Sequence, residues 1–138
     1  MVTEAFARMS DDDVFGTRCP CVYLLQSTVR ARRTYVGCTT CTVRRRLRQH
    51  NGELSGGAKQ TETARPWTVR IIVTGFRSRQ EALQFEFAWR RVHRRGRHAY
   101  SVVGRRNSLR KLCEMTRWSR NAPLASEVPL RVTHYALE

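Results

Sequence analysis

The sequence predicts a small α/β domain whose central sheet, mixed or antiparallel and of about three strands, is flanked by helices. Two observations indicate this fold class. Short β-prone runs and helical segments follow one another in the order strand, strand, helix, strand, helix. The chain has 138 residues with 41% hydrophobic content, which is enough for one core of ordinary size. The simplest expectation is therefore a single domain.

The first predicted elements are a β-hairpin and a basic helix. CVYLLQ at 21–26 and TYVGC at 34–38 are short, β-prone runs joined by a basic linker, which favours an antiparallel hairpin. A helix is expected within 42–52, with Thr40 or Thr42 as its N-cap and an Asn-Gly pair as its stop. Its residues are mainly polar and cationic, so packing alone does not explain it.

The strongest predicted strand and a second helix come next. The run WTVRIIVTGF at 67–76 is rich in β-branched residues, which favour strands. Ser78 and Glu81 then match an S-x-x-E capping box. The helix that they begin is expected to end at about Val92 or His93.

The remainder of the chain predicts a third helix and an extended segment. NSLRKLCEMTRW at 107–118 has apolar residues on one helical face, and PLRVTHYAL at 129–137 is typical of a last strand or an extended tail. We therefore expect an N-terminal tail over 1–20, a central domain over 21–96, and a C-terminal segment over 97–138 that packs on or extends that domain.

The charge of the chain predicts a polyanionic partner. Lys and Arg number 26 against 11 acidic residues, giving a net charge of +15 and a pI near 11.2. Most of the excess is arginine, whose planar guanidinium binds phosphate in a bidentate manner. Nucleic-acid binding is the leading expectation. Membrane binding is weaker, because no long uncharged apolar run occurs and the basic run at 90–98 lacks a bulky apolar face.

The N-terminus and the cysteines indicate a reducing, intracellular setting. The first residues are too polar and acidic for a signal peptide, and five cysteines do not form a secreted disulfide framework. Cys19, Cys21, Cys38 and Cys41 have the paired spacing of a four-thiolate zinc site, which is one alternative. Two of them fall inside predicted strands, where a small packing residue is the usual interpretation.

One carboxylate stands out in the second helix. EALQFEFAWRR at 81–91 is apolar nearly all the way round, yet it contains Glu86. Helical neighbours lie three and four positions away, and Arg90 is the one possible cationic partner there. An unpaired buried carboxylate costs several kcal/mol. Glu86 is therefore either an edge residue, in water or paired with Arg90, or a group that another cation compensates.

Several short motifs together cover about half of the chain. They are VYLL at 22–25, TYVG at 34–37, RRLRQHNG at 45–52, GGA at 56–58, PW at 66–67, GF at 75–76 and ALQFEFAW at 82–89. In this order they resemble the GIY-YIG nuclease superfamily, and within it the Slx-type structure-specific endonuclease subunit. Tyr35-Val36-Gly37 matches the second half of the name motif, and Val22-Tyr23 stands where the first half has Ile-Tyr. The resemblance implies the GIY-YIG nuclease fold with a C-terminal helical extension.

The resemblance also implies a catalytic site that hydrolyses a phosphodiester by in-line attack of water. Glu86 stands where such nucleases hold one divalent metal, Mg²⁺ or Mn²⁺, which would supply the missing countercharge. Arg46 would bind the non-bridging phosphate oxygens. Tyr35 or Tyr23 would orient and deprotonate the water, and His50 is an alternative base. These three candidates for the base stay open.

The implied substrate is branched double-stranded DNA, such as flaps and Holliday-type junctions, cleaved during DNA repair or recombination in the nucleus. The basic run at 90–98 is a candidate duplex contact or nuclear-import signal. The candidate substrate-binding residues are Arg45, Arg48, Gly37, Arg90, Arg94 and Arg95.

Two departures from this pattern leave alternatives open. Slx-type subunits usually continue into a RING-like zinc domain that docks on a scaffold partner, but Cys113 is the last cysteine, so that domain is not expected and dependence on a scaffold is in doubt. The chain is then a shortened or free-standing homologue, or a fragment. The alternative functions are a catalytically inactive, basic nucleic-acid-binding module on the same fold and a zinc-dependent structural protein.

Overall fold

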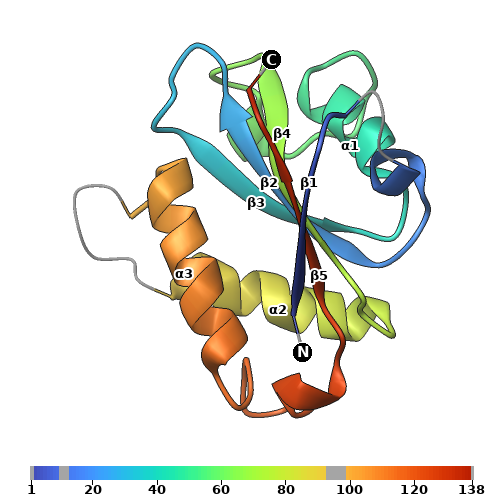
Figure 1. Ribbon diagram of the computed structural model, residues 1–138. Coiled ribbons are helices and arrows are strands. Elements are labelled where there is room, and N and C mark those ends of the chain that lie inside the picture. Colours follow the sequence, from blue (N-terminus) through green and yellow to red (C-terminus); the bar gives the residue numbers. More distant parts are fainter. Residues whose placement is uncertain (1, 10–12, 93–98, 138) are drawn as a thin grey trace.

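The computed structural model describes residues 2–9, 13–92 and 99–137. Figure 1 shows a twisted sheet with helices packed against it, and the strand order is β1-β5-β4-β2-β3. β1 and β5 are parallel, and the other neighbouring strands are antiparallel. In chain order the elements are β1 Thr3–Ala7, η1 Asp13–Gly16, β2 Cys21–Ser27, β3 Thr34–Thr39, α1 Val43–His50, η2 Lys59–Thr61, β4 Trp67–Thr74, α2 Arg79–Arg91, α3 Val102–Glu114, η3 Ala125–Glu127 and β5 Arg131–Tyr135.

The α/β class is confirmed, but the sheet of the described chain has five strands and the prediction of about three was wrong. The additional strands, β1 and β5, come from opposite ends of the sequence and pair from Thr3 with Arg131 to Ala7 with Tyr135. No local pattern indicates a pairing of such distant segments, and β1, with two alanines and a glutamate among its five residues, carries little strand signal of its own. Of the two interpretations of 129–137, the strand is the one that the structure contains.

The predicted hairpin is confirmed, and β2 within it connects the two cores. All seven residues of β2 are buried, because the strand lies between β3 and β4 with helices over both faces. Val22 and Leu24 face the core under α2 and α3. Tyr23 and Leu25 face the opposite core, under α1 and η1. This alternation follows from the two-residue period of a strand and presents Tyr23 to α1.

The N-caps of the first two helices explain where each begins. The Thr42 side chain accepts a hydrogen bond from the Arg45 backbone N–H at 3.1 Å, so Thr42 rather than Thr40 caps α1. Ser78 accepts from the backbone N–H of Glu81 at 3.2 Å and caps α2, as the capping box predicts. α2 ends at Arg91.

The third helix differs from the predicted range 107–118. α3 begins at Val102, because Ser101 accepts a hydrogen bond from the backbone N–H of Gly104 at 3.2 Å. The glycine and the basic residues after it hide this start in the sequence, since they favour a loop. The helix ends at Glu114, so the predicted face is shorter, although its two leucines are buried.

Candidate active site

The first half of the site is a tyrosine on β2 that reaches across its neighbouring strand. Tyr23 is fully buried and its register partner on β3 is Gly37. A Cβ added at Gly37 would lie 2.4 Å from the Tyr23 phenol oxygen. Gly37 therefore gives the phenol room to reach α1, where its oxygen lies 2.7 Å from Nε2 of His50.

The hydrogen bonds of His50 fix its tautomer, and its pKa determines its charge. The Thr61 hydroxyl donates to the carbonyl of Ala58 at 2.8 Å, so its oxygen accepts from Nδ1–H of His50, also at 2.8 Å. Nε2 is then the acceptor for the Tyr23 hydroxyl. Burial, helped by the charges of Arg46 and Arg65, lowers the pKa of His50 to about 4. His50 is therefore neutral at pH 7 and accepts a hydrogen bond from Tyr23 without taking its proton.

The two hairpin tyrosines differ in accessibility. Burial raises the pKa of the Tyr23 phenol above its ordinary value, and the nearby charge of Arg46 opposes that shift only in part. Tyr35, on β3, is half-buried and lines a surface pocket. Its ring centroid lies 5.0 Å from that of His50. Tyr35 is thus the phenol that solvent can reach, and Tyr23 is part of the packing behind it.

Arg46 is held beside this group by the loop that contains the GGA motif. Its Nη1 donates to Oε1 of Gln49 at 2.6 Å and to the carbonyl of Gly56 at 3.0 Å. A Cβ at Gly57 would lie 2.4 Å from the Gln49 carbonyl oxygen, so a glycine is needed for the loop to pack against the end of α1. These contacts leave part of a half-buried guanidinium available to an anion next to Tyr23 and His50.

The second half of the site comes from α2. The Glu86 side chain is 17% exposed, and its ion pair with Arg90 joins Oε1 and Nε at 3.8 Å, beyond hydrogen-bond range. Burial raises the pKa of Glu86, and Arg90 offsets this in part. The guanidinium of Arg90 donates to the Val36 carbonyl at 2.6 and 3.1 Å and lies 5.3 Å from the Tyr35 ring centroid. Arg90 therefore lies between the Glu86 carboxylate on α2 and the Tyr35 ring on β3.

The surroundings of Glu86 suit a ligand for a hard cation. Glu86 has oxygen atoms that no short hydrogen bond within the described ranges occupies, in a setting that disfavours the free anion. No group of three or more His, Cys, Asp or Glu side chains converges among the described residues. Glu86 thus fits a hard cation that keeps most of its waters, such as Mg²⁺, and not an ion that needs several protein ligands. All five cysteines lie in the described part of the chain, which builds no four-thiolate zinc site.

The structure brings most of the predicted site residues together. Tyr23, Tyr35, Gly37, Arg46 and His50 form one cluster, which Arg90 joins to Glu86. Of the remaining four, the two that lie in the described chain do not contact it. Arg45 and Arg48 are exposed on α1, where Arg48 forms an ion pair with Glu53 at 3.9 Å, and Arg94 and Arg95 lie outside the described residues.

Sequence reasoning missed the residues that support His50 from the 53–66 loop. Thr61 is fully buried and orients the imidazole, while Nε of Arg65 donates to the His50 carbonyl at 2.7 Å. Both residues lie in a polar stretch that predicts only a loop. Nothing in a single sequence marks Thr61 as buried, because the imidazole that it orients comes from another element.

The fold and this cluster define a GIY-YIG catalytic domain. A family model with that description matches residues 19–100, more than half of the chain, and the chain therefore belongs to this family. Among curated proteins it is similar to the "Structure-specific endonuclease subunit slx1" of Talaromyces stipitatus, with 53% identity over 75 residues, which are 53% of this chain and 19% of that protein. It is 46% identical over 105 residues to the subunit SLX1 of Cryptococcus neoformans, covering 66% of this chain and 21% of that protein.

These similarities concern only a part of each relative. The chain spans about a fifth of the length of the curated relatives that it matches. Within the described residues, no helix is both long enough and apolar enough to cross a membrane.

Proposed function

We propose that this chain is a metal-dependent endonuclease that hydrolyses phosphodiester bonds in branched DNA during repair or recombination in the nucleus. The observation that carries the proposal is Glu86, a largely buried carboxylate whose one described ionic partner is 3.8 Å away and also contacts Tyr35. A carboxylate held in this way is poorly compensated in the free protein. The motif order, the family and the similarity to proteins named structure-specific endonuclease subunits support the same function.

Glu86 would hold one divalent metal, Mg²⁺ or Mn²⁺, next to the scissile phosphate. When bound, such an ion supplies Lewis-acid stabilisation of the negative charge that develops on phosphate oxygens. The packing of α2 against the sheet keeps the carboxylate in one place, because Phe85 and Trp89 on either side of it are fully buried. The protein thus contributes a rigid single ligand.

Arg46, Tyr35 and the Tyr23–His50 pair would perform the remaining steps. Arg46 binds the non-bridging oxygens of the scissile phosphate through the guanidinium atoms that the loop leaves available. Tyr35 would orient the attacking water and, in its phenolate form, would receive the proton and become a neutral phenol, because it is the accessible tyrosine. Tyr23 and His50 position Tyr35 through ring packing. His50 is the weaker candidate for the base, because its Nε2 already accepts from Tyr23 and burial lowers its pKa to about 4.

Branched DNA would lie along the basic surface next to this cluster. Arg45 and Arg48 are exposed on α1 and are suited to backbone phosphates, as is Arg90 beside Tyr35. The central domain of 21–96 would carry the chemistry, and the segment 97–138 would extend it. A scaffold subunit would be a second partner, since the similar proteins are named as subunits of an endonuclease.

The proposal is tested by cleavage of end-labelled duplex, 5′-flap and four-way-junction DNA with Mg²⁺ or with EDTA. We expect nicking of the branched substrates with Mg²⁺ only. Tyr35→Phe should lower the rate at least about a hundredfold, and Tyr23→Phe should lower it less, because Tyr23 acts through its packing. A wild-type protein that binds these substrates without any Mg²⁺-stimulated cleavage would instead be the inactive nucleic-acid-binding module. A larger loss in Tyr23→Phe would reverse the two tyrosine roles.

A further inference from the structure

The surface pocket that Tyr35 lines has a volume of about 200 Å³. Two of its lining residues are arginines from different helices, Arg90 of α2 and Arg105 of α3, and none of the lining residues that the structure describes is acidic. A pocket of this size is smaller than a typical small-molecule site and suits a phosphate with part of its sugar. The lining residues are Thr34, Tyr35, Val36, Gln60, Arg90, Tyr100 and Arg105.

Arg105 is the unusual member of this pocket. It is only 8% exposed, and its Nε donates to the hydroxyl of Thr34 at 3.3 Å. Its guanidinium carbon lies 5.1 Å from the ring centroid of Tyr100. No carboxylate of the described residues lies within 4 Å of it, whereas a buried charge is normally paired. Burial accordingly lowers the pKa of Arg105, Tyr100 opposes this shift in part, and the nearby Arg90 acts in the same direction as burial.

A phosphate group would remove this imbalance. Arg90 and Arg105 both line the same small space, so one anion placed there can be contacted from two helices. Tyr100 is half exposed, and the guanidinium of Arg105 lies over its ring. Its exposed part offers a surface for a base that is not stacked in a duplex. Unpaired or displaced nucleotides of this kind occur at the branch point of a flap or junction.

We propose that this pocket binds a non-scissile backbone phosphate of a branched DNA substrate through Arg105 and Arg90, with the adjacent unpaired base against Tyr100. The proposal rests on the proposed function, because the pocket shares Tyr35 with the candidate active site. It goes beyond the family match, which ends at residue 100 and does not include Arg105. The helix that follows the catalytic domain thus contributes to substrate selection.

The experiment measures equilibrium binding of a 5′-flap substrate in EDTA, by fluorescence anisotropy over a range of salt concentrations. Arg105→Gln should weaken binding roughly tenfold. It should also reduce the slope of log K against log salt by about 0.7–0.9, as expected for the loss of one phosphate contact. The matched control is Arg110→Gln, an exposed arginine on the same helix, for which we expect little change in affinity.

A thermodynamic cycle then locates the phosphate. Replacing single phosphates of the flap substrate by neutral methylphosphonates should identify one position, other than the scissile one, whose replacement weakens wild-type binding but not Arg105→Gln binding. Coupling to the scissile phosphate alone, or the same response in Arg105→Gln and Arg110→Gln, would overturn the proposal. Because binding is measured without metal, a chain that fails to cleave DNA but shows this coupling contradicts the proposed function and not the pocket.

Folding is controlled by thermal unfolding of each variant, since Arg105 is buried. If Arg105→Gln does not fold, the same binding measurement is made with Tyr100→Leu, which changes an exposed ring. This variant should weaken binding of the flap substrate several-fold and leave binding of the matched duplex unchanged. Equal affinities of Tyr100→Leu and the wild type for the flap would then refute the pocket.

Discussion

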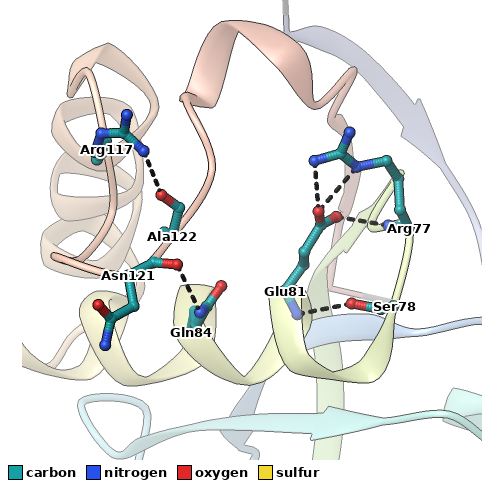
Figure 2. A network of polar contacts seen from close by, with 7 residues as sticks. All are labelled: Arg77, Ser78, Glu81, Gln84, Arg117, Asn121 and Ala122. Carbon is teal, nitrogen blue, oxygen red and sulfur yellow. Dashed lines mark hydrogen bonds and ion pairs between the residues drawn. The ribbon is translucent and has the colours of Figure 1, made fainter.

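Two glutamates on one helix have nearly equal burial and opposite surroundings. The side chains of Glu81 and Glu86 on α2 are 11% and 17% exposed. Glu81 accepts hydrogen bonds at 2.8 Å from both the backbone N–H and the Nε of Arg77, and its Oε2 lies 2.7 Å from Nη2 of the same residue (Figure 2). Glu86 has its one described ion pair at 3.8 Å, with Arg90. The exposed fraction of the side chain therefore does not separate the two carboxylates, but the geometry of their partners does.

The pKa values of the two groups move in opposite directions. Burial by itself raises the pKa of Glu81, but the hydrogen bonds and charge of Arg77 outweigh it and lower that pKa below the ordinary value. Burial also raises the pKa of Glu86, and Arg90 is too distant to reverse the effect. Glu81 is thus a satisfied helix-capping group, whereas Glu86 is an anion that the protein holds without full compensation.

The largest effect expected from this comparison is on catalysis. Glu86→Gln should lower the Mg²⁺-dependent cleavage rate of a flap substrate at least about a hundredfold, because a neutral amide is a poor ligand for a hard cation. Glu81→Gln makes the same chemical change five positions away, and should leave the rate per folded molecule within about twofold of the wild type. Rates are measured under single-turnover conditions, with DNA affinity determined in parallel.

The two variants control for each other, since both remove one negative charge from α2. A similar loss of cleavage in both would mean that net charge, and not the position of Glu86, governs activity. Cleavage by Glu86→Gln at the wild-type rate, in preparations free of contaminating nuclease, would remove Glu86 from the metal site.

The next largest effect is on stability, and here Glu81→Gln is expected to have the larger effect of the two variants. Glu81→Gln should lower the free energy of unfolding by about 1–2 kcal/mol. The carboxylate accepts from both the backbone N–H and the guanidinium of Arg77, and a neutral amide replaces these two hydrogen bonds poorly. Glu86→Gln should leave the free energy of unfolding unchanged or raise it slightly, since it removes a poorly paired charge. Urea unfolding at pH 7 measures both. A clear destabilisation by Glu86→Gln would show that Arg90 stabilises the carboxylate better than its distance indicates.

How much the sequence predicts differs between the two glutamates for a physical reason. Ser78 and Glu81 lie within one helical turn, so the cap is visible as a local motif, and helical spacing likewise identifies Arg90 as the neighbour of Glu86. One detail of the cap was not predictable. The Glu81 carboxylate accepts a hydrogen bond from the backbone N–H of Arg77, one residue before the N-cap, and not from that of Ser78.

Long-range contacts account for what the sequence did not predict. The pairing of β1 with β5 joins the two ends of the chain, and Thr61 meets His50 only once the 53–66 loop folds back on α1. Arg105 lies just before the predicted third helix, where no local pattern indicates burial, yet it is buried because α3 packs beside α2 and β3. The five clustered site residues were predictable only through their joint resemblance to one family. Taken singly, each has an ordinary structural interpretation.

The smallest effect expected from the comparison is the pH dependence of stability, and its sign differs between the glutamates. The folded-state pKa of Glu81 is lowered, so its contribution is complete above the ordinary glutamate pKa of about 4.3 and is lost as the pH falls below it. The folded-state pKa of Glu86 is raised, so its ionisation reduces stability as the pH rises through that value.

Between pH 7 and pH 4, the free energy difference between wild type and Glu81→Gln should therefore shrink. Any advantage of Glu86→Gln over wild type should disappear over the same interval. The differences should be within about 1 kcal/mol, and urea unfolding of the three proteins in parallel cancels titrations that they share, such as that of His50. Parallel curves for the two variants would mean that the carboxylates titrate alike, and the contrast between a satisfied and an uncompensated glutamate would then be wrong.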